Sequence, residues 1–351
     1  MDETQDPEPA PVAPTKPPIV SCLAFLLLLG VGAGAAGYAL LRASQPARAP
    51  NGAAILSHPE LGRVLAVGVS KGQLLVVEKF SGRLWRETAG GQLEYYGAQA
   101  PGRYKIGSTL IGSHYVPLAS GNQVLVLDST SGLTQPLADG ADAYMTRATA
   151  SEELVATSSR RDSVIRVFRI SDGALLWKET KRQRGGGGRV AFNEDLLAVG
   201  AQDGKVLLYE AATGELVWTL SRDGGPIRAL CFSPDGSHLA AATADETVAI
   251  WLTGAEGPPS LEFKAGDGLG LTAIAFSEDG EFLATGNEIG LLEVWDPTGR
   301  LLFSLPHDNE ALFERTRHDP TRVGSIVFND KDVIWSVYDR VYTFDVTKPP
   351  Q

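Results

Sequence analysis

Hydrophobic and polar residues alternate in short runs along most of the chain, and small, polar or glycine-containing turns separate the runs. The segment GKVLLYEAATGELVWTL, from Gly204 to Leu220, contains two such runs with one turn between them. Similar phrases stand at 72–87, 163–179 and 290–305. A period of two residues is typical of half-buried strands, so each phrase predicts a strand, a turn and a second strand.

The phrases recur at a nearly constant interval. Alignment on the last large residue of the first strand gives seven anchors: Val77, Leu127, Phe168, Tyr209, Trp251, Trp295 and Phe344. Successive anchors lie 50, 41, 41, 42, 44 and 49 residues apart. One unit shows four predicted strands, at 271–277, 282–286, 291–296 and 300–305. A period of about 40–45 residues with four short strands predicts a β-propeller, whose blades bury their faces against each other.

We therefore predict an all-β domain over residues 53–347, a single propeller of seven four-stranded blades, followed by a short tail at 348–351. The last unit shows only three strands before the chain ends. A strand near Ala53–Ser57 would supply the fourth and close the ring, but the sequence leaves this point open.

Two phrases, SPDGSHLAAATADETVAIW and SEDGEFLATGNEIGLLEVWD, resemble WD-repeat blades, and the resemblance covers about residues 53–347. The acidic residue that follows the anchor in this family is present in five units, as Glu78, Asp128, Glu210, Asp296 and Asp345. The resemblance implies that an aspartate six residues before the anchor ties the turn between the second and third strands, and that position holds Asp162, Asp203 and Asp245. The chain has one literal Trp-Asp pair and no Gly-His dipeptide, so the family's hydrogen-bond network is incomplete.

Three other phrases, AATGELVW, SDGALLW and SGRLW, resemble the tryptophan-docking phrase of quinoprotein-like (PQQ-like) propellers. The resemblance implies that Trp85, Trp177 and Trp218 pack on a neighbouring blade, which is core packing and not chemistry. A quinone-dependent dehydrogenase of that kind would be a larger, eight-bladed ring with a Ca²⁺ site, and nothing in this sequence marks one.

The N-terminal region differs in composition from the repeats. Residues 1–18 hold six prolines and four acids, which predicts a disordered tail. Residues 19–41 are uncharged and, as a helix of about 35 Å, slightly exceed the ~30 Å hydrocarbon core of a bilayer. We predict a single-pass transmembrane helix there and a linker at 42–52. A cleaved signal peptide is the alternative, although the apolar run is longer than usual and an acidic segment precedes it.

Small residues recur inside this apolar run. Gly30, Gly34 and Gly37 are candidate helix-packing positions for self-association, because small residues four apart let two membrane helices approach closely. The alternative is the ordinary glycine and alanine content of such helices. The few bases beside the run, among them Lys16 and Arg42, leave the side of the membrane on which the propeller lies undetermined.

The net charge and the short motifs exclude several classes of function. A net charge of −11 argues against a general nucleic-acid binder. The GVSKG phrase at Gly68–Gly72 places its serine in a predicted hairpin, whereas a nucleophilic serine needs a strand-to-helix elbow. The histidines, which show no metal-ligand spacing, are His58, His114, His238, His307 and His318. Cys22 and Cys231 lie in different parts of the chain and are not expected to pair. We predict no catalytic site, no metal and no cofactor.

Two inter-blade loops depart most from the repeat. The segment KRQRGGGGR carries the candidate partner-binding residues Lys181, Arg182, Arg184 and Arg189, and the insertion at 307–322 carries Phe313, Arg315 and Arg317. Loops on a rigid scaffold commonly carry binding, and arginine pairs well with carboxylates. Solvated loops without a partner are the alternative.

We therefore predict a membrane-anchored β-propeller that acts as a non-catalytic scaffold for protein–protein interaction. Two alternatives remain: an envelope or outer-membrane assembly factor of the quinoprotein-like type, and a cofactor-binding propeller enzyme. The sequence does not identify the partner.

Overall fold

The computed structural model describes the chain in fourteen stretches of the unit Pro46–Gln351: 47–48, 53–56, 58–70, 72–78, 83–89, 91–99, 115–120, 123–131, 133–137, 145–159, 164–179, 189–266, 268–306 and 322–348. In these stretches no helix is long and apolar enough to cross a membrane. The segment predicted to do so, 19–41, lies outside them, as do its candidate packing residues Gly30, Gly34 and Gly37.

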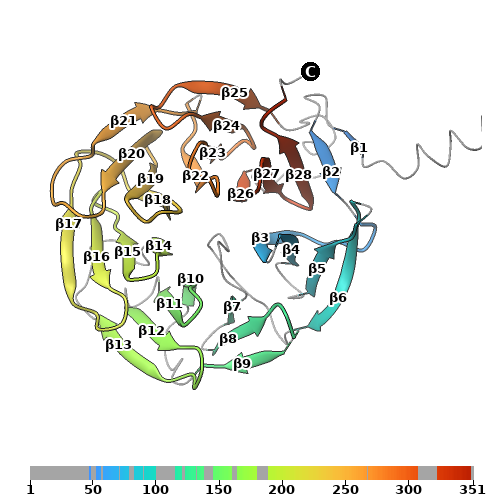
Figure 1. The fold of residues 1–351 in the computed structure, drawn as a ribbon, viewed down its shortest axis with the longest axis horizontal. Helices are drawn as coiled ribbons and strands as arrows, with labels where there is room; N and C mark the ends of the chain where they lie inside the picture. Colours follow the sequence, from blue (N-terminus) through green and yellow to red (C-terminus); the bar gives the residue numbers. More distant parts are fainter. Residues whose placement is uncertain are drawn as a thin grey trace, which may run out of the picture. The chain divides into compact units, whose positions relative to one another are not determined.

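Seven antiparallel sheets form a ring, and each sheet is one blade (Figure 1). Blade 1 is β3 (Val64–Ser70), β4 (Gln73–Glu78), β5 (Arg83–Glu87) and β6 (Leu93–Gln99), and blade 2 is β7 (Tyr115–Ser120), β8 (Gln123–Asp128) and β9 (Thr134–Pro136). Blade 3 is β10 (Met145–Ala150), β11 (Leu154–Ser159), β12 (Ile165–Arg169) and β13 (Leu175–Glu179), and blade 4 is β14 (Arg189–Phe192), β15 (Leu196–Gly200), β16 (Val206–Glu210) and β17 (Leu216–Leu220).

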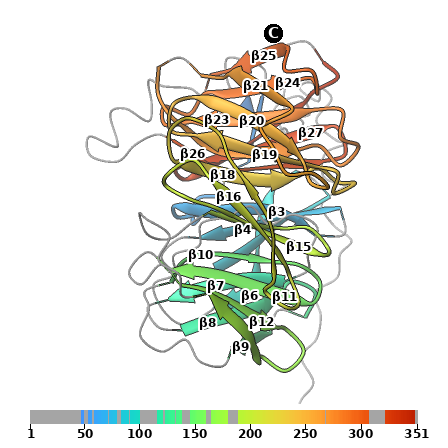
Figure 2. The same ribbon diagram turned by 90° about the vertical axis from the view of Figure 1, so that its left-hand side faces the viewer.

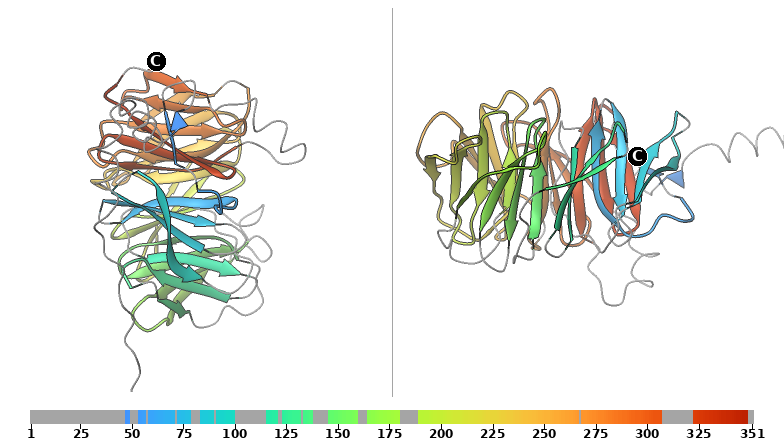
Figure 3. Two further views of the ribbon diagram at one scale, coloured as in Figure 1. Left: turned by 90° about the vertical axis from the view of Figure 1, so that its right-hand side faces the viewer. Right: turned by 90° about the horizontal axis from the view of Figure 1, so that it is seen from below.

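The remaining blades follow in chain order around the ring. Blade 5 is β18 (Ile227–Phe232), β19 (His238–Thr243), β20 (Thr247–Leu252) and β21 (Leu261–Lys264), and blade 6 is β22 (Leu271–Phe276), β23 (Leu283–Asn287), β24 (Leu292–Trp295) and β25 (Leu301–Leu305). Blade 7 is β26 (Val323–Asn329), β27 (Asp332–Val337), β28 (Arg340–Asp345), β2 (Ala54–Leu56) and β1 (Ala47–Arg48). Figure 2 shows these twisted sheets side by side, and in Figure 3 their strands run between the two faces of the ring.

The ring closes with an N-terminal strand. Strand β2 pairs antiparallel with β28, with Ile55 opposite Tyr342 and Leu56 opposite Val341. The backbone N–H of Val64 donates to the Tyr338 carbonyl oxygen at 2.7 Å, and Val67 N–H donates to Ser325 Oγ at 2.9 Å. The start of the chain therefore supplies the fourth strand that the last repeat lacks, which answers the question that the sequence left open.

The seven blades and the strand bounds predicted for blade 6 are confirmed, but the strand number of blade 7 and the strand position of two anchors are wrong. In blade 6 each observed strand end lies within one residue of its predicted position. However, blade 7 has five strands, and blade 2 has three in the described residues, which omit 138–144 after β9. Anchors Val77 and Leu127 lie on second strands, whereas the other anchors lie on third strands. Because β2 joins blade 7, β3 becomes the innermost strand of blade 1. The repeated phrase at 72–87 therefore begins on the second strand of blade 1, whereas in blades 3 to 6 the equivalent phrase begins on the third strand.

Aromatic side chains on the outer strands connect neighbouring blades. Trp177 of blade 3 donates from Nε1 to the Ala211 carbonyl oxygen of blade 4 at 2.9 Å, and its ring lies 5.7 Å from that of Tyr209. The same arrangement pairs Phe263 with Trp295, at 4.7 Å, and Phe303 with Phe344, at 5.4 Å. Since each anchor is buried, these contacts extend the core from blade to blade.

The three predicted docking tryptophans all pack against a neighbouring blade. Trp218 contacts the apolar cluster that contains Trp251 of blade 5, as Trp177 contacts blade 4. Trp85 instead packs with Val327 and Ile334 of blade 7, the blade that precedes it in the ring. Its position on the third strand of blade 1, and not on the outermost strand, accounts for the opposite direction.

Candidate interaction face

Antiparallel strands bring two kinds of connection to the same face of the ring. The segments that join the fourth strand of one blade to the first strand of the next leave from this face, as do the turns between second and third strands. We call it the loop face. The turns between first and second strands, and between third and fourth strands, lie on the opposite face.

The two segments predicted to bind partners both open onto the loop face. One runs from β13, which ends at Glu179, to β14, which begins at Arg189, and the other runs from β25 to β26 and reaches Arg322. Of the predicted residues only Arg189 is described, and it is half-buried at the start of β14. Lys181, Arg182, Arg184, Phe313, Arg315 and Arg317 lie outside the described residues. The structure thus brings the ends of both segments to one face but at separate blade junctions.

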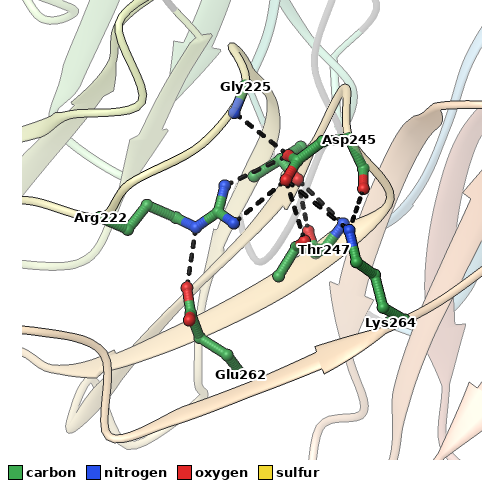
Figure 4. Close-up of polar contacts among 7 residues, drawn as sticks. Arg222, Gly225, Asp245, Thr247, Glu262 and Lys264 are labelled. Carbon is green, nitrogen blue, oxygen red and sulfur yellow. Dashed lines mark hydrogen bonds and ion pairs between the residues drawn. The ribbon is translucent and has the colours of Figure 1, made fainter.

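A charged cluster lies on the loop face between these junctions (Figure 4). Arg222, in the segment between β17 and β18, donates from Nη1 and Nη2 to the two carboxylate oxygens of Asp245, each at 3.2 Å. Its Nε donates to Glu262 Oε1 at 2.8 Å. Only 5% of the Arg222 side chain is exposed, whereas Asp245 is 37% exposed, so the guanidinium is shielded from water while its carboxylate partner stays partly solvated, and the bidentate geometry orients the segment.

Asp245 collects further donors in the turn between β19 and β20. The Gly225 N–H donates to Oδ1 at 3.3 Å and Thr247 Oγ1 donates to Oδ2 at 3.1 Å, while Lys264 Nζ donates to the Asp245 carbonyl oxygen at 2.5 Å (Figure 4). Burial alone would raise the pKa of Asp245, but hydrogen bonds from Arg222 and neighbouring threonines, with the charge of Arg222, hold that pKa well below its usual range. The carboxylate is therefore charged at every physiological pH.

This cluster confirms one predicted role and shows partners that the sequence did not. Asp245 ties its turn as the resemblance implied, and Asp203 does so more weakly, accepting from Lys205 N–H at 3.3 Å. Asp162 lies outside the described residues. The repeat gave no signal for Arg222 or Glu262, because they stand 40 residues apart in the chain and meet only when blades 4 and 5 pack together.

Four of the five acidic residues after the anchors accept hydrogen bonds from the turns that follow them, whereas Glu78 accepts from Gly62 N–H and from the Trp85 indole. Asp296 Oδ1 accepts from Thr298 N–H at 3.0 Å, Asp128 Oδ1 from Thr130 N–H at 2.7 Å, and Asp345 Oδ1 from Thr347 N–H at 3.0 Å. Glu210 accepts from Thr213 Oγ1, and the buried Glu78 accepts from Trp85 Nε1 at 3.1 Å. These contacts stabilise the ring. In blades 3 to 7 the acidic residues stand at the ends of third strands, and those ends lie on the face opposite the loop face.

The described residues contain little that suggests catalysis. Ser70 ends β3 and stands in a hairpin with β4, so it lacks the strand-to-helix elbow that a nucleophilic serine needs. No group of three or more His, Cys, Asp or Glu in the described stretches could hold a metal ion. Burial raises the pKa of the Cys231 thiol, which makes it a poor nucleophile.

Comparisons with known proteins give partial matches. A family model described as outer membrane protein assembly factor BamB (PQQ_2) matches residues 160–250. Small ribosomal subunit protein RACK1y of Oryza sativa subsp. japonica is 31% identical over 145 residues, 39% of this chain and 42% of that protein. Target of rapamycin complex subunit wat1 of Schizosaccharomyces pombe is 34% identical over 101 residues, 29% of this chain and 32% of that protein. The matches thus span less than half of each of these relatives.

Solved structures agree on the fold. The computationally designed Ika8 protein superposes with a TM-score of 0.60 at 19% identity, covering 83% of this chain and 98% of that one. An identity this low is informative about architecture alone. Together, the sheet arrangement and the partial matches support a seven-bladed β-propeller of the WD40/PQQ-like kind.

Proposed function

We propose that this chain is a membrane-anchored, non-catalytic β-propeller that holds protein partners on its loop face. The observation that carries the proposal is that the two segments that depart most from the repeat both begin and end on that face, on either side of the rigid Arg222 cluster. Two partial relatives carry the names of subunits of larger assemblies, a ribosomal subunit and a target of rapamycin complex. The apolar run at 19–41 supplies the anchor.

The anchor is tested by fractionation. Full-length protein should stay in the membrane pellet after a carbonate wash, whereas residues 46–351 should be soluble, because only the longer chain carries the apolar run. Release of intact, uncleaved full-length protein by the wash would remove the anchor from the proposal.

The binding face is tested by charge reversal and capture from membranes. Lys181→Glu, Arg182→Glu and Arg184→Glu together should weaken capture of partner proteins, and wild-type capture should fall as salt rises, since exposed charges are screened. Thermal stability should change little, because exposed ion pairs contribute only about 0–1 kcal/mol. The matched control reverses Arg169 and Arg300, which lie by third–fourth turns on the opposite face. Equal loss of capture in both variants would contradict a loop-face site.

The second segment is tested in the same assay. Phe313→Ala with Arg315→Glu and Arg317→Glu should also weaken capture, because an apolar side chain followed closely by two arginines suits a partner surface with an acidic rim. Undiminished capture in both sets of variants would move the binding site to the rim of the blades or to the membrane segment.

One specific observation favours a second candidate, an envelope assembly factor. The family model that matches residues 160–250 bears the description of an outer membrane protein assembly factor. In that case the propeller lies outside the cytoplasm. Protease added to intact cells with a permeabilised outer envelope would then digest the propeller, and the captured partners would be exported proteins. Protection from the protease until the inner membrane is opened would exclude this candidate.

A further inference from the structure

Blade 5 departs from the repeat at the residue that follows its anchor. In blade 5 this residue is Leu252, which is 49% exposed. In the third strands of the other blades from 3 to 7 the same position is charged and bonds to the turn that follows, and it is Arg169, Glu210, Asp296 or Asp345. An exposed leucine cannot make such bonds, so the folding of blade 5 does not account for its presence there.

Leu252 faces the junction between blades 5 and 6. Val248 and Ile250, which precede it on β20 at intervals of two residues, pack in an apolar cluster with Trp295 of blade 6. Because side chains alternate along a strand, Leu252 points to the same side of its sheet. It ends β20, so it lies where the junction reaches the face opposite the loop face.

Leu301 of blade 6 points into the same junction from the other side. It lies opposite Trp295 in the pairing of β24 with β25, and paired residues of antiparallel strands project from the same side of their sheet. Trp295 faces blade 5, where its ring lies 4.7 Å from that of Phe263. Leu301 is 43% exposed and begins β25, so it also lies near the opposite face.

The side chains between these two leucines are apolar as well. Leu261 lies opposite Ile250 in the pairing of β20 with β21, and Leu252 is two residues, about 7 Å, along the strand from that pair. Leu261 and Phe263 are half-buried against the same cluster, and a Cβ on Gly299 of blade 6 would lie 2.7 Å from a ring carbon of Phe263. In Figure 1, β21 and β25 follow each other along the outer edge of the ring. We call this surface the junction patch, formed by Leu252, Leu261, Phe263 and Leu301.

The charges around the junction patch are mainly negative. Blades 5 and 6 are described without a gap on the opposite face, and their turns there carry one base, Arg300, and six carboxylates: Asp235, Glu256, Glu278, Asp279, Glu281 and Asp296. The neighbouring turn of blade 7 adds Lys331. Both bases already pair with these acids, Arg300 with Asp296 at 2.9 Å and Lys331 with Asp279 and Glu281. The surroundings of the patch therefore keep a net negative charge.

Two further observations support this charge. Hydrogen bonds from Ser233 and Ser237 lower the pKa of Asp235 to about 2, so this carboxylate is charged at neutral pH. The turns of blade 4 on the same face add only carboxylates: Glu194, Asp195, Glu210 and Glu215. A negative field around an apolar surface attracts partners of opposite charge and repels acidic ones.

We propose that the junction patch docks a basic amphipathic segment of another protein, in which large apolar side chains stand among lysines or arginines. The apolar side chains cover the leucines and remove them from water, while the bases meet the surrounding carboxylates. A second copy of this chain fits less well, because each copy carries a net charge of −11. The inference goes beyond the proposed function, since it assigns a separate surface on the face opposite the loop face.

The test measures the fluorescence anisotropy of three labelled peptides, each of about twelve residues, with full-length protein in neutral lipid nanodiscs and empty nanodiscs as the blank. The first peptide is an amphipathic sequence of lysine and leucine. The second has serine in place of every leucine, and the third has glutamate in place of every lysine. We expect the lysine–leucine peptide to bind about tenfold more tightly than either of the others, and its affinity to fall as salt rises.

Paired substitutions locate the binding on the molecule. Leu252→Ser with Leu301→Ser should weaken binding of the lysine–leucine peptide about tenfold, because the two leucines form the exposed part of the patch. The matched control is Leu133→Ser with Leu269→Ser, which removes two leucines that are 72% and 41% exposed on the loop face, and it should change the affinity little. Circular dichroism should show both variants folded at the assay temperature.

A third variant separates the charge from the apolar contact. Glu256→Gln with Glu278→Gln leaves every leucine in place and removes two of the six carboxylates. It should weaken binding of the lysine–leucine peptide and reduce the dependence of that binding on salt, since fewer charges attract the lysines. An unchanged affinity and salt dependence would overturn the role of the carboxylates.

The remaining outcomes decide the occupant. Equal weakening by the two leucine pairs, or equally tight binding of the lysine–serine peptide, would overturn the junction patch as the docking site. Equally tight binding of the glutamate–leucine peptide would overturn the preference for a basic partner. Self-association of the protein alone in sedimentation, abolished by Leu252→Ser with Leu301→Ser, would make a second copy the occupant and overturn the proposal. Since each arm uses the same nanodiscs, none of these outcomes depends on the loop-face segments.

Discussion

Trp251 and Trp295 occupy equivalent positions in blades 5 and 6, but among the described residues only one has a hydrogen-bond acceptor. Trp295 Nε1 donates to Thr285 Oγ1 at 3.0 Å, while the equivalent of Thr285 in blade 5 is Ala241, and the buried Trp251 Nε1 has no acceptor in the described part of the chain. A buried donor without an acceptor costs about 1–3 kcal/mol. We expect Ala241→Ser to raise the free energy of unfolding of residues 46–351 by about 1 kcal/mol in urea denaturation.

Two controls show whether the new hydroxyl acts through the indole. In a Trp251→Phe background, Ala241→Ser should give no gain, since no N–H remains to be bonded. Thr285→Ala should lower the free energy of unfolding by about 1–3 kcal/mol, because it leaves the Trp295 N–H in the state that Trp251 now has. A gain from Ala241→Ser that survives Trp251→Phe would refute the hydrogen-bond explanation.

The aspartates after the anchors predict acid sensitivity. Hydrogen bonds from Thr298 and from the Arg300 backbone lower the pKa of Asp296 to about 2, and bonds from Lys348 and Thr347 lower that of Asp345 to about 2. A depressed folded-state pKa stabilises the fold above the unfolded value of about 3.9, and this stabilisation is lost as the pH falls toward 2. Asp296→Asn and Asp345→Asn should be less stable than wild type at pH 7 and should approach it near pH 2. A constant difference over a pH series of denaturation curves would contradict this assignment.

At the scale of the element, the repeat predicted the strands because every blade must bury its two apolar faces against its neighbours in the same way. The anchors recur where a third strand turns its large residue toward the preceding blade, so Phe168, Tyr209, Trp251 and Trp295 could be found from period alone. The sequence could not predict that Val77 and Leu127 lie on second strands in blades 1 and 2. This shift depends on the sheet that β2 joins, and β2 pairs with β28, near the other end of the chain.

The candidate face was predictable only in part. The sequence identified the segments at 181–189 and 307–322 by their departure from the period, and the topology adds that both open onto one face. The sequence could not show that Arg222 contacts Asp245 and Glu262. Arg222 lies in a loop outside the repeated strand pattern, and both of its partners belong to the next blade.

The docking of outer strands on neighbouring blades predicts a difference between two turn glycines. Gly214 has a φ of 77°, and a Cβ there would lie 2.6 Å from a ring carbon of Trp177. Gly280 has a φ of 72° with nothing within 4 Å of such a Cβ. Both alanine variants impose about 1–2 kcal/mol of left-handed strain, but only Gly214→Ala also displaces the tryptophan, for about 1–3 kcal/mol more. Equal losses in urea denaturation would show that Trp177 docking contributes little.

At the scale of the whole molecule, ring closure depends on three residues of β2, Ala54–Leu56, so a short segment decides whether seven blades act as one unit. Residues 46–351 keep β1 and β2, and we expect them to unfold in one urea transition, seen alike by tryptophan fluorescence and circular dichroism. Residues 58–351 lack both strands, which exposes the edge of β28 and removes Leu56 from its core cluster. We expect this shorter chain to lose several kcal/mol, to unfold with non-coincident probes and to self-associate on size-exclusion chromatography. The same urea midpoint and the same monomeric elution for both chains would mean that other contacts hold blade 7 in place. The N-terminal strand would then contribute little to the closure of the ring.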